Sequence, residues 1–137
     1  MGKLTDAVKN AIKEADLYPL ATASNSGHPN VVPVKFVLIE NDSELWLVDN
    51  FMDKTLTNLV QNPIAALNIL VPEKDIAYQI KGTTTIETRG DNYQKMRDIV
   101  LEVKPDAPAK GLIVMQVTEV FDCWPGPTIG HRIDGNS

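Results

Sequence analysis

Residues 30–49 read NVVPVKFVLIENDSELWLVD, and this stretch decides the fold. Its first ten residues are mostly β-branched or apolar, which is typical of a β-strand. The polar residues at 40–43 predict a tight turn, and residues 44–49 predict the return strand. Because strands joined by so short a turn run antiparallel, the stretch predicts a β-hairpin. Pro33 cannot donate to a sheet ladder, so we expect it at a sheet edge or a bulge.

The rest of the chain adds four strands and three short helices to this hairpin. Apolar residues at helical spacing predict helices at 4–15, 53–62 and 91–103. Runs of β-branched and apolar residues predict strands at 18–24, 64–71, 77–87 and 112–121. A six-stranded antiparallel sheet of this size tends to close on itself, because closure removes its edges. We therefore expect a mainly β fold, a six-stranded antiparallel barrel with about three short flanking helices, and an irregular tail from about residue 124.

Length and composition narrow the classes of function. The 137 residues fit one domain, which we expect to span residues 1–137. A formal net charge of −5 argues against binding to nucleic acid or to an anionic membrane surface. A single cysteine, Cys123, excludes an intrachain disulfide, and with two distant histidines it argues against a metal site. The first residues include no apolar signal region, so we expect a cytoplasmic protein.

Candidate chemistry is concentrated at residues 50–55, where a predicted strand leads into a predicted helix. The first turn of a helix has backbone N–H groups without internal partners, and the helix dipole favours an anion there. The dipole alone disfavours Lys54 at this place, whereas a bound phosphate would resolve the conflict, and Thr55 adds a hydroxyl donor. The carboxylate of Asp53 counts against a phosphate there unless it turns back to cap the helix. The other interpretation is a solvated lysine next to an ordinary N-cap at Asp53, and the local residues leave both open.

Two further lysines interrupt predicted strands. Lys35 lies inside the run at 30–39, and Lys81 lies inside the run at 77–87. Because strand side chains alternate between the two faces, each lysine can point to water. Together with Lys54, they would instead form a cationic pocket on an acidic protein. Gly82 in mid-strand suggests a bulge or the close approach of another group.

Several segments, taken in order, resemble the pyridoxamine 5'-phosphate oxidase-like, FMN-binding split-barrel family. They resemble its second strand, its third strand, its phosphate-binding helix and a later strand with a Lys-Gly pair. In chain order the segments are GHPNVVPVKF (27–36), LWLVD (45–49), KT (54–55), NLVQNP (58–63) and IKGTT (80–84). The ordered set carries the resemblance, which runs from about residue 18 to residue 122. The short chain is most similar to the small FMN-binding members of the family.

The resemblance implies a split barrel of Greek-key type that forms a homodimer and binds FMN at the subunit interface. It implies that Lys54 and Thr55 bind the phosphate, and that the backbone of residues 48–50 lines the isoalloxazine edge. Trp124 would either cover the flavin of the partner subunit or pack on its own barrel. The cofactor-binding residues that we expect are Pro33, Val34, Lys35, Val48, Asp49, Asn50, Met52, Lys54, Thr55, Lys81 and Trp124.

The implied function is that of a flavoprotein, either an electron carrier or a small flavin-dependent oxidoreductase, with a small molecule or a protein as redox partner. The chain lacks the arginine-rich substrate motifs of the oxidase itself, so we do not expect it to oxidise pyridoxamine phosphate. Because related split barrels bind the deazaflavin F420, an F420-binding reductase is an alternative. An oligonucleotide-binding barrel is another, but its groove would be basic and rich in aromatics, whereas this chain is acidic with 6% aromatic residues.

Overall fold

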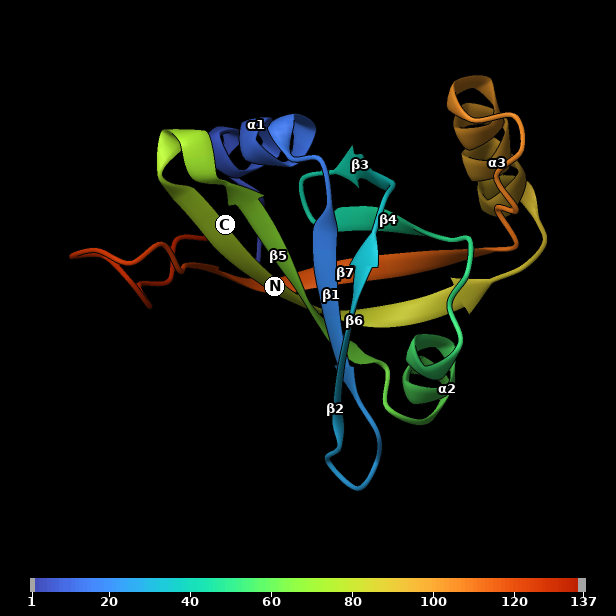
Figure 1. Cartoon of the computed structure of the whole chain (residues 1–137), viewed down its shortest axis with the longest axis horizontal. Coiled ribbons are helices and arrows are strands. Elements are labelled where there is room, and N and C mark those ends of the chain that lie inside the picture. The colour runs from blue at the N-terminus through green and yellow to red at the C-terminus, as the bar shows by residue number, and fades with distance from the viewer. Residues whose placement is uncertain (1, 136–137) are drawn as a thin grey trace.

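Within the described residues, one antiparallel sheet of seven strands forms the body of the molecule, and three α-helices pack against it (Figure 1). The computed structural model describes residues 2–135. The helices are α1 (Asp6–Glu14), α2 (Lys54–Gln61) and α3 (Asp91–Val103). The strands are β1 (Tyr18–Ala23), β2 (Pro29–Val34), β3 (Val37–Asn41), β4 (Glu44–Asp49), β5 (Ile64–Val71), β6 (Ile76–Glu87) and β7 (Gly111–Asp122), with a 3₁₀ turn, η1 (Pro72–Lys74), between β5 and β6. The predicted mainly β, antiparallel fold with three short helices is confirmed.

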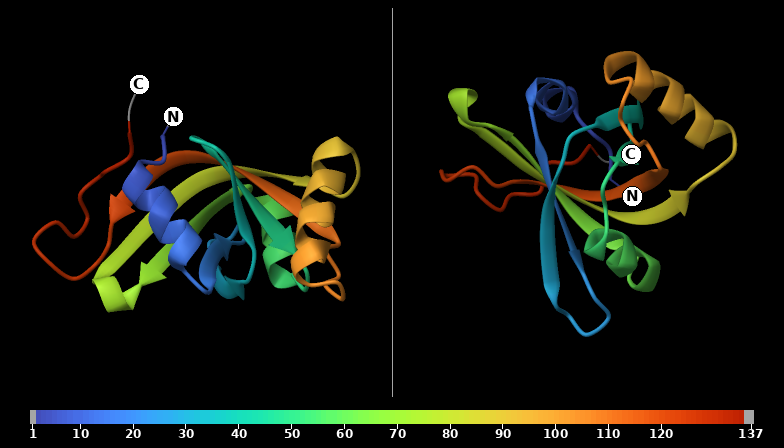
Figure 2. Two further views of the ribbon diagram at one scale, coloured as in Figure 1. Left: turned by 90° about the horizontal axis from the view of Figure 1, so that it is seen from above. Right: turned by 45° about the vertical axis from the view of Figure 1, so that its right-hand side comes forward.

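The strand order is β2-β1-β5-β6-β7-β4-β3, so β2 and β3 are the two outer strands. Only Lys35 and Phe36 separate them in the chain, which therefore crosses directly from one edge of the sheet to the other. Figure 2 shows the resulting strong curl of the sheet. The prediction of a single strand over residues 30–39 was wrong, because the chain leaves β2 at Lys35 to make this crossing. The described residues thus form seven strands instead of six, and no ladder joins β2 to β3 to close a barrel.

Two apolar clusters lie on opposite faces of β4. Leu45 and Leu47 belong to the larger cluster, to which α1 contributes Val8 and Ile12. Their neighbours on β4 point the other way and belong to a smaller cluster with Met96 of α3. The smaller cluster consists of Trp46, Val48, Met96, Val100, Ala107, Ala109, Leu112 and Val114. Both faces of β4 are therefore covered, and α3 is fixed beside the end of β4 that leads to α2.

Pro33 and Gly82 occupy the special positions that the sequence predicts. Pro33 lies on the outer strand β2, where it is paired in register with Pro19 of β1. The register between β6 and β7 shifts at Lys81/Gly82, which is a β-bulge. A Cβ atom at Gly82 would collide with the backbone carbonyl of Gln116, so only glycine fits there.

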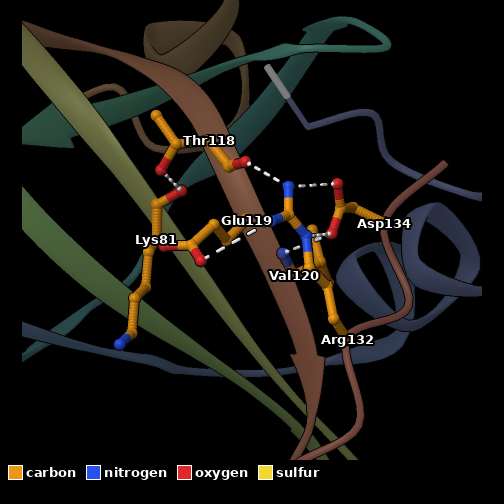
Figure 3. A network of polar contacts seen from close by, with 6 residues as sticks. All are labelled: Lys81, Thr118, Glu119, Val120, Arg132 and Asp134. Atoms are coloured by element: carbon orange, nitrogen blue, oxygen red, sulfur yellow. Dashed lines mark hydrogen bonds and ion pairs between the residues drawn. The ribbon is translucent and has the colours of Figure 1, made fainter. Parts of the chain in front are cut away.

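The segment after β7 folds back and ties both ends of the described chain to the sheet. The guanidinium of Arg132 donates to the carbonyl of Thr118 at 3.3 Å and to the carboxylate of Asp134 at 3.0 Å, as Figure 3 shows. The same carboxylate accepts the backbone N–H of Val120, and Lys3 pairs with Gly135. Hydrogen bonds from Arg132 hold the pKa of Asp134 below its ordinary value.

None of the helices in residues 2–135 is long and apolar enough to cross a bilayer.

Candidate functional site

A cavity of about 760 Å³ lies between β2, the end of β4 and the start of α2. This volume falls inside the range of about 300–1,000 Å³ that is usual for small-molecule sites. Apolar side chains form much of its wall, and three lysines from three different segments also line it. The lining residues are Asn30, Val31, Val32, Pro33, Val34, Lys35, Phe36, Val48, Asn50, Phe51, Met52, Asp53, Lys54, Thr55 and Lys104.

Most of the cofactor-binding residues that we expected from the sequence line this cavity. They are Pro33, Val34, Lys35, Val48, Asn50, Met52, Lys54 and Thr55. Three nominated residues do not line it. Lys81 lies on β6 with its ammonium 5.4 Å from the ring centre of Phe121, and Trp124 begins the segment after β7. The carboxylate of Asp49 is buried next to the cavity wall and points toward residues 110 and 111.

The start of α2 combines groups that bind anions with one carboxylate, that of Asp53. Lys54 is the first helical residue, and Asp53 occupies the N-cap position without a capping hydrogen bond from its side chain. The N–H groups of the first turn therefore lack the acceptor that an N-cap aspartate often supplies. Lys54 is exposed and makes no ion pair within residues 2–135. Lys54 and Thr55 of this first turn both line the cavity, and the exposed residue Asp53 lines it beside them.

A buried polar cluster fixes the start of α2 against β1 and β2. The amide of Asn30 donates to the hydroxyl oxygen of Thr55 at 2.9 Å, and the amide of Asn58 donates to the hydroxyl oxygen of Thr22 at 3.1 Å. Asn30 also donates to Thr22 at 3.3 Å. Because Thr55 accepts from Asn30, its own O–H proton remains available to donate. The cluster therefore positions a hydroxyl donor beside Lys54 with little freedom.

A second, smaller hollow of about 340 Å³ adjoins the first. The two share Asn30, Asp53 and Lys54, so the Lys54 side chain borders both. The second hollow is more polar, and its other lining residues are Ser24, His28, Pro29, Thr57 and Asn58.

The loop between β4 and α2, residues 50–53, forms one wall of the larger cavity. The backbone N–H of Met52 donates to a carboxylate oxygen of Asp49 at 2.8 Å, which closes a tight turn. Lys110 donates to the Met52 carbonyl at 2.9 Å. Burial raises the pKa of Asp49, while the Met52 N–H and the Lys110 ammonium act in the opposite direction.

Several residues that line the cavity were not predicted from the sequence. Lys104 follows α3, far from the other lining residues in the chain, and no local pattern marks it. Asn30 belongs to the strand run that we quoted, but its contact with Thr55 depends on the packing of α2 against β2. Phe36 and Phe51 read as ordinary apolar residues. Only the fold brings these four residues to one cavity.

Several solved protein structures have the same fold as this chain. The HupZ protein of Group A Streptococcus has a TM-score of 0.80 and 23% identity, covering 93% of this chain and 99% of that one. An FMN-binding protein of Syntrophomonas wolfei has a TM-score of 0.63 and 13% identity, covering 83% of this chain and 86% of that one. A protein named F420 reductase has a TM-score of 0.66 and 16% identity, covering 85% of this chain and 98% of that one. At these identities the likeness shows the fold alone.

Comparison at the level of sequence is more specific. The chain is 35% identical over 134 residues to an uncharacterized protein of Methanocaldococcus jannaschii, MJ0282, and the match covers 96% of this chain and 88% of that protein. The family model for pyridoxamine 5'-phosphate oxidase matches residues 4–124. This range includes the strands and α-helices of the described part of the chain and the whole lining of the cavity. The chain therefore belongs to the pyridoxamine 5'-phosphate oxidase family.

Proposed function

We propose that the protein is a flavoprotein that binds FMN in the larger cavity, with the phosphate at the start of α2. The observation that carries the proposal is the convergence of Lys54, Thr55 and the uncapped first turn of α2 at one end of an apolar cavity. A phosphate at that place would accept from backbone N–H groups, from the Thr55 hydroxyl and from the Lys54 ammonium. A dianion would also offset the cost of a lysine at a helix N-terminus.

The remaining length of the cavity suits the ring system of a flavin. Val34, Val48 and Met52 offer apolar contact, while the backbone of the 50–53 loop offers polar groups. Lys35 adds positive charge to the wall, which favours an anionic ligand beside it, and Lys104 lines the wall while paired with Asp106 at 3.2 Å. The donor set, the charge and the apolar surface therefore fit FMN.

Bound FMN supplies hydride and single-electron transfer, and the protein contributes binding, orientation and access. The chain's own part is to fix the phosphate at Lys54 and Thr55 and to hold the 50–53 loop against the ring. Val34, Val48 and Met52 would exclude water from one side of the cofactor. We propose that the protein works as an electron carrier or as a small oxidoreductase, with a redox partner that approaches from the open side of the cavity.

We further propose that a second copy of the chain completes the site. Phe51 is 82% exposed and Val31 is 66% exposed, and both line the cavity. Large apolar side chains this exposed at the rim of a site are typical of a surface that a partner covers. Because the cavity opens beside them, a homodimer would enclose the cofactor that one chain leaves partly open to water.

The first experiment is the absorbance spectrum of the purified protein, followed by acid release of any ligand and its identification by mass. A yellow protein that releases FMN supports the proposal. A colourless protein that also takes up no added FMN contradicts it.

Replacing Lys54 by alanine tests the placement of the phosphate. We expect Lys54→Ala to weaken FMN binding by about 10- to 100-fold, because a charge-assisted hydrogen bond contributes about 1.5–3 kcal/mol. Fluorescence quenching of FMN on titration with apoprotein measures the dissociation constant. Lys74→Ala is the matched control, since Lys74 is an exposed lysine paired with Glu14 and remote from the cavity lining. Equal affinities for wild type and Lys54→Ala would remove Lys54 from the site.

F420 is the second candidate cofactor, because a neighbour in fold is named F420 reductase. The hollow that adjoins Lys54 supports this candidate, since F420 carries a further substituent beyond its phosphate and FMN does not. Titration of the apoprotein with each cofactor separates the two. Saturable binding of F420 without binding of FMN would transfer the proposal from FMN to the deazaflavin.

A further inference from the structure

The loop at residues 50–53 determines the geometry of the proposed cofactor site. All four of its residues line the cavity, and the next two residues are Lys54 and Thr55. The conformation of this loop therefore determines where the first N–H groups of α2 point and where the cavity wall lies. A residue that holds the loop in place therefore influences cofactor binding even if it does not contact the cofactor.

The segment of residues 107–111, which we call the strap, holds this loop from behind. The ammonium of Lys110 donates to the carbonyl of Met52 at 2.9 Å and lies 3.7 Å from the carboxylate of Asp49. The backbone N–H of Lys110 donates to the carbonyl of Asp49 at 3.0 Å. Lys110 thus contacts both ends of the turn that precedes α2, yet it does not line the cavity.

The strap is itself held in place by α3, so its contacts can hold the loop in place. The backbone N–H of Ala109 donates to the side-chain oxygen of Asn50 at 2.8 Å. Ala109 is fully buried and has a φ of 41°, in the left-handed region that residues other than glycine rarely adopt. Tyr93 of α3 donates to the Ala109 carbonyl at 2.9 Å, and Arg97 donates to the Pro108 carbonyl at 3.1 Å. These contacts fasten the strap to α3.

Charge makes Lys110 the sensitive position of this arrangement. Asp49 is only 2% exposed, so its carboxylate needs a nearby cation or several donors to remain ionised. It has the Met52 N–H and the Lys110 ammonium. The Lys110 side chain is 47% exposed, so its loss opens no cavity in the core. Removing its charge leaves a buried carboxylate without a cation and the Met52 carbonyl without this donor.

We infer that Lys110 is a positioning residue for the cofactor, which holds the 50–53 loop in its binding conformation through Asp49 and Met52. The inference rests on the proposed flavin function. In Lys110→Met the aliphatic stem remains and the charge is lost, so the loop loosens while the core of the fold is retained. FMN then binds about tenfold more weakly, although Lys110 lies outside the cavity lining.

The test compares Lys110→Met, Lys110→Arg and the control Lys74→Met in two measurements. The control removes an ion-paired lysine of similar exposure, 55%, at a distant surface. FMN affinity is measured by fluorescence quenching, and amide hydrogen exchange of residues 49–53 is measured on the apoproteins by mass spectrometry. We expect weaker FMN binding and faster exchange of this peptide in Lys110→Met alone, with recovery of both in Lys110→Arg, which keeps a charged donor.

The two measurements separate this inference from the proposal on which it rests. If the wild type binds FMN and Lys110→Met binds it equally well, the inference is overturned and the flavin function stands. If the wild type binds no FMN, the flavin function falls, and unchanged exchange of residues 49–53 in Lys110→Met overturns the inference as well. Weaker binding that Lys110→Arg does not recover would also contradict a role for the charge.

Discussion

At the scale of single residues, Gly82 shows how one position shapes the sheet. A side chain there would meet the backbone carbonyl of Gln116, and a backbone carbonyl in a ladder cannot move aside. The bulge at Lys81/Gly82 lets β6 and β7 stay paired from Tyr78 to Glu87 with a change of register. This bulge therefore depends on the absence of a single methyl group.

We predict that Gly82→Ala destabilises the protein by about 1–3 kcal/mol, the usual cost of overpacking a tight site. Urea unfolding followed by circular dichroism gives the free energy of unfolding. Gly126→Ala is the matched control, because the nearest atom to its Cβ would be 4.0 Å away. We expect the control to change stability by less than about 0.5 kcal/mol. A Gly82→Ala protein as stable as this control would contradict the collision.

The residues of the site differ in how far the sequence could reveal them. Lys54 was recognisable because a lysine in the first turn of a helix conflicts with the dipole, and because the segment resembles a known family. Lys104 was not recognisable, since its approach to the cavity depends on the packing of α3 against Trp46 and Val48. Asp49 was expected to line the site through its backbone, and nothing in the sequence indicates that its buried carboxylate pairs with Lys110.

At the scale of elements, the sequence predicted every α-helix and most strands of residues 2–135 within a few residues. The exception is the run at 30–39, which is continuous in β propensity and nevertheless divides into β2 and β3. The division is a property of the whole sheet, because the chain must pass from one outer strand to the other, and the carbonyl of Phe36 then accepts from Val48 of β4 at 3.2 Å. Local propensity contains no information about that crossing.

The segment after β7 gives a prediction about pH. The Asp134 side chain is buried, and its pKa is lowered first by hydrogen bonds from Arg132. A carboxylate whose pKa is lower in the folded than in the unfolded state stabilises the fold above the unfolded value, about 3.9. That stabilisation is lost as the pH falls through the lower, folded value. We expect Asp134→Asn to reduce the free energy of unfolding at pH 7 by about 1–3 kcal/mol.

The measurement is urea unfolding at several pH values between neutrality and about pH 3, below the unfolded pKa of Asp134. The difference between wild type and Asp134→Asn should shrink toward the acid end, because the wild type loses its ionised carboxylate there. Asp106→Asn is the control, since its carboxylate is exposed and its ion pair with Lys104 is solvated. A difference for Asp134→Asn that stays constant over this range would contradict the assignment.

At the scale of the whole molecule, two of the exposed large apolar residues lie at the cavity. Phe51 and Val31 line the cavity and are also among the most exposed large apolar side chains of the described chain. A monomer gains nothing from leaving them in water, since each fully buried side chain of this kind contributes about 1.5–3 kcal/mol. The proposed dimer would use both residues and would shield the cofactor at the same time.

We therefore predict that Phe51→Glu shifts the protein from dimer to monomer and weakens FMN binding in the same variant. A buried charge at an apolar interface costs several kcal/mol unless it is paired, so one substitution is enough to separate two copies. Light scattering after size-exclusion chromatography measures the mass, with and without FMN. Leu17→Glu is the matched control, since Leu17 is 50% exposed and does not line the cavity. If the wild type is a monomer with FMN bound, FMN binding does not require a dimer. If Phe51→Glu is still a dimer, the interface does not include Phe51.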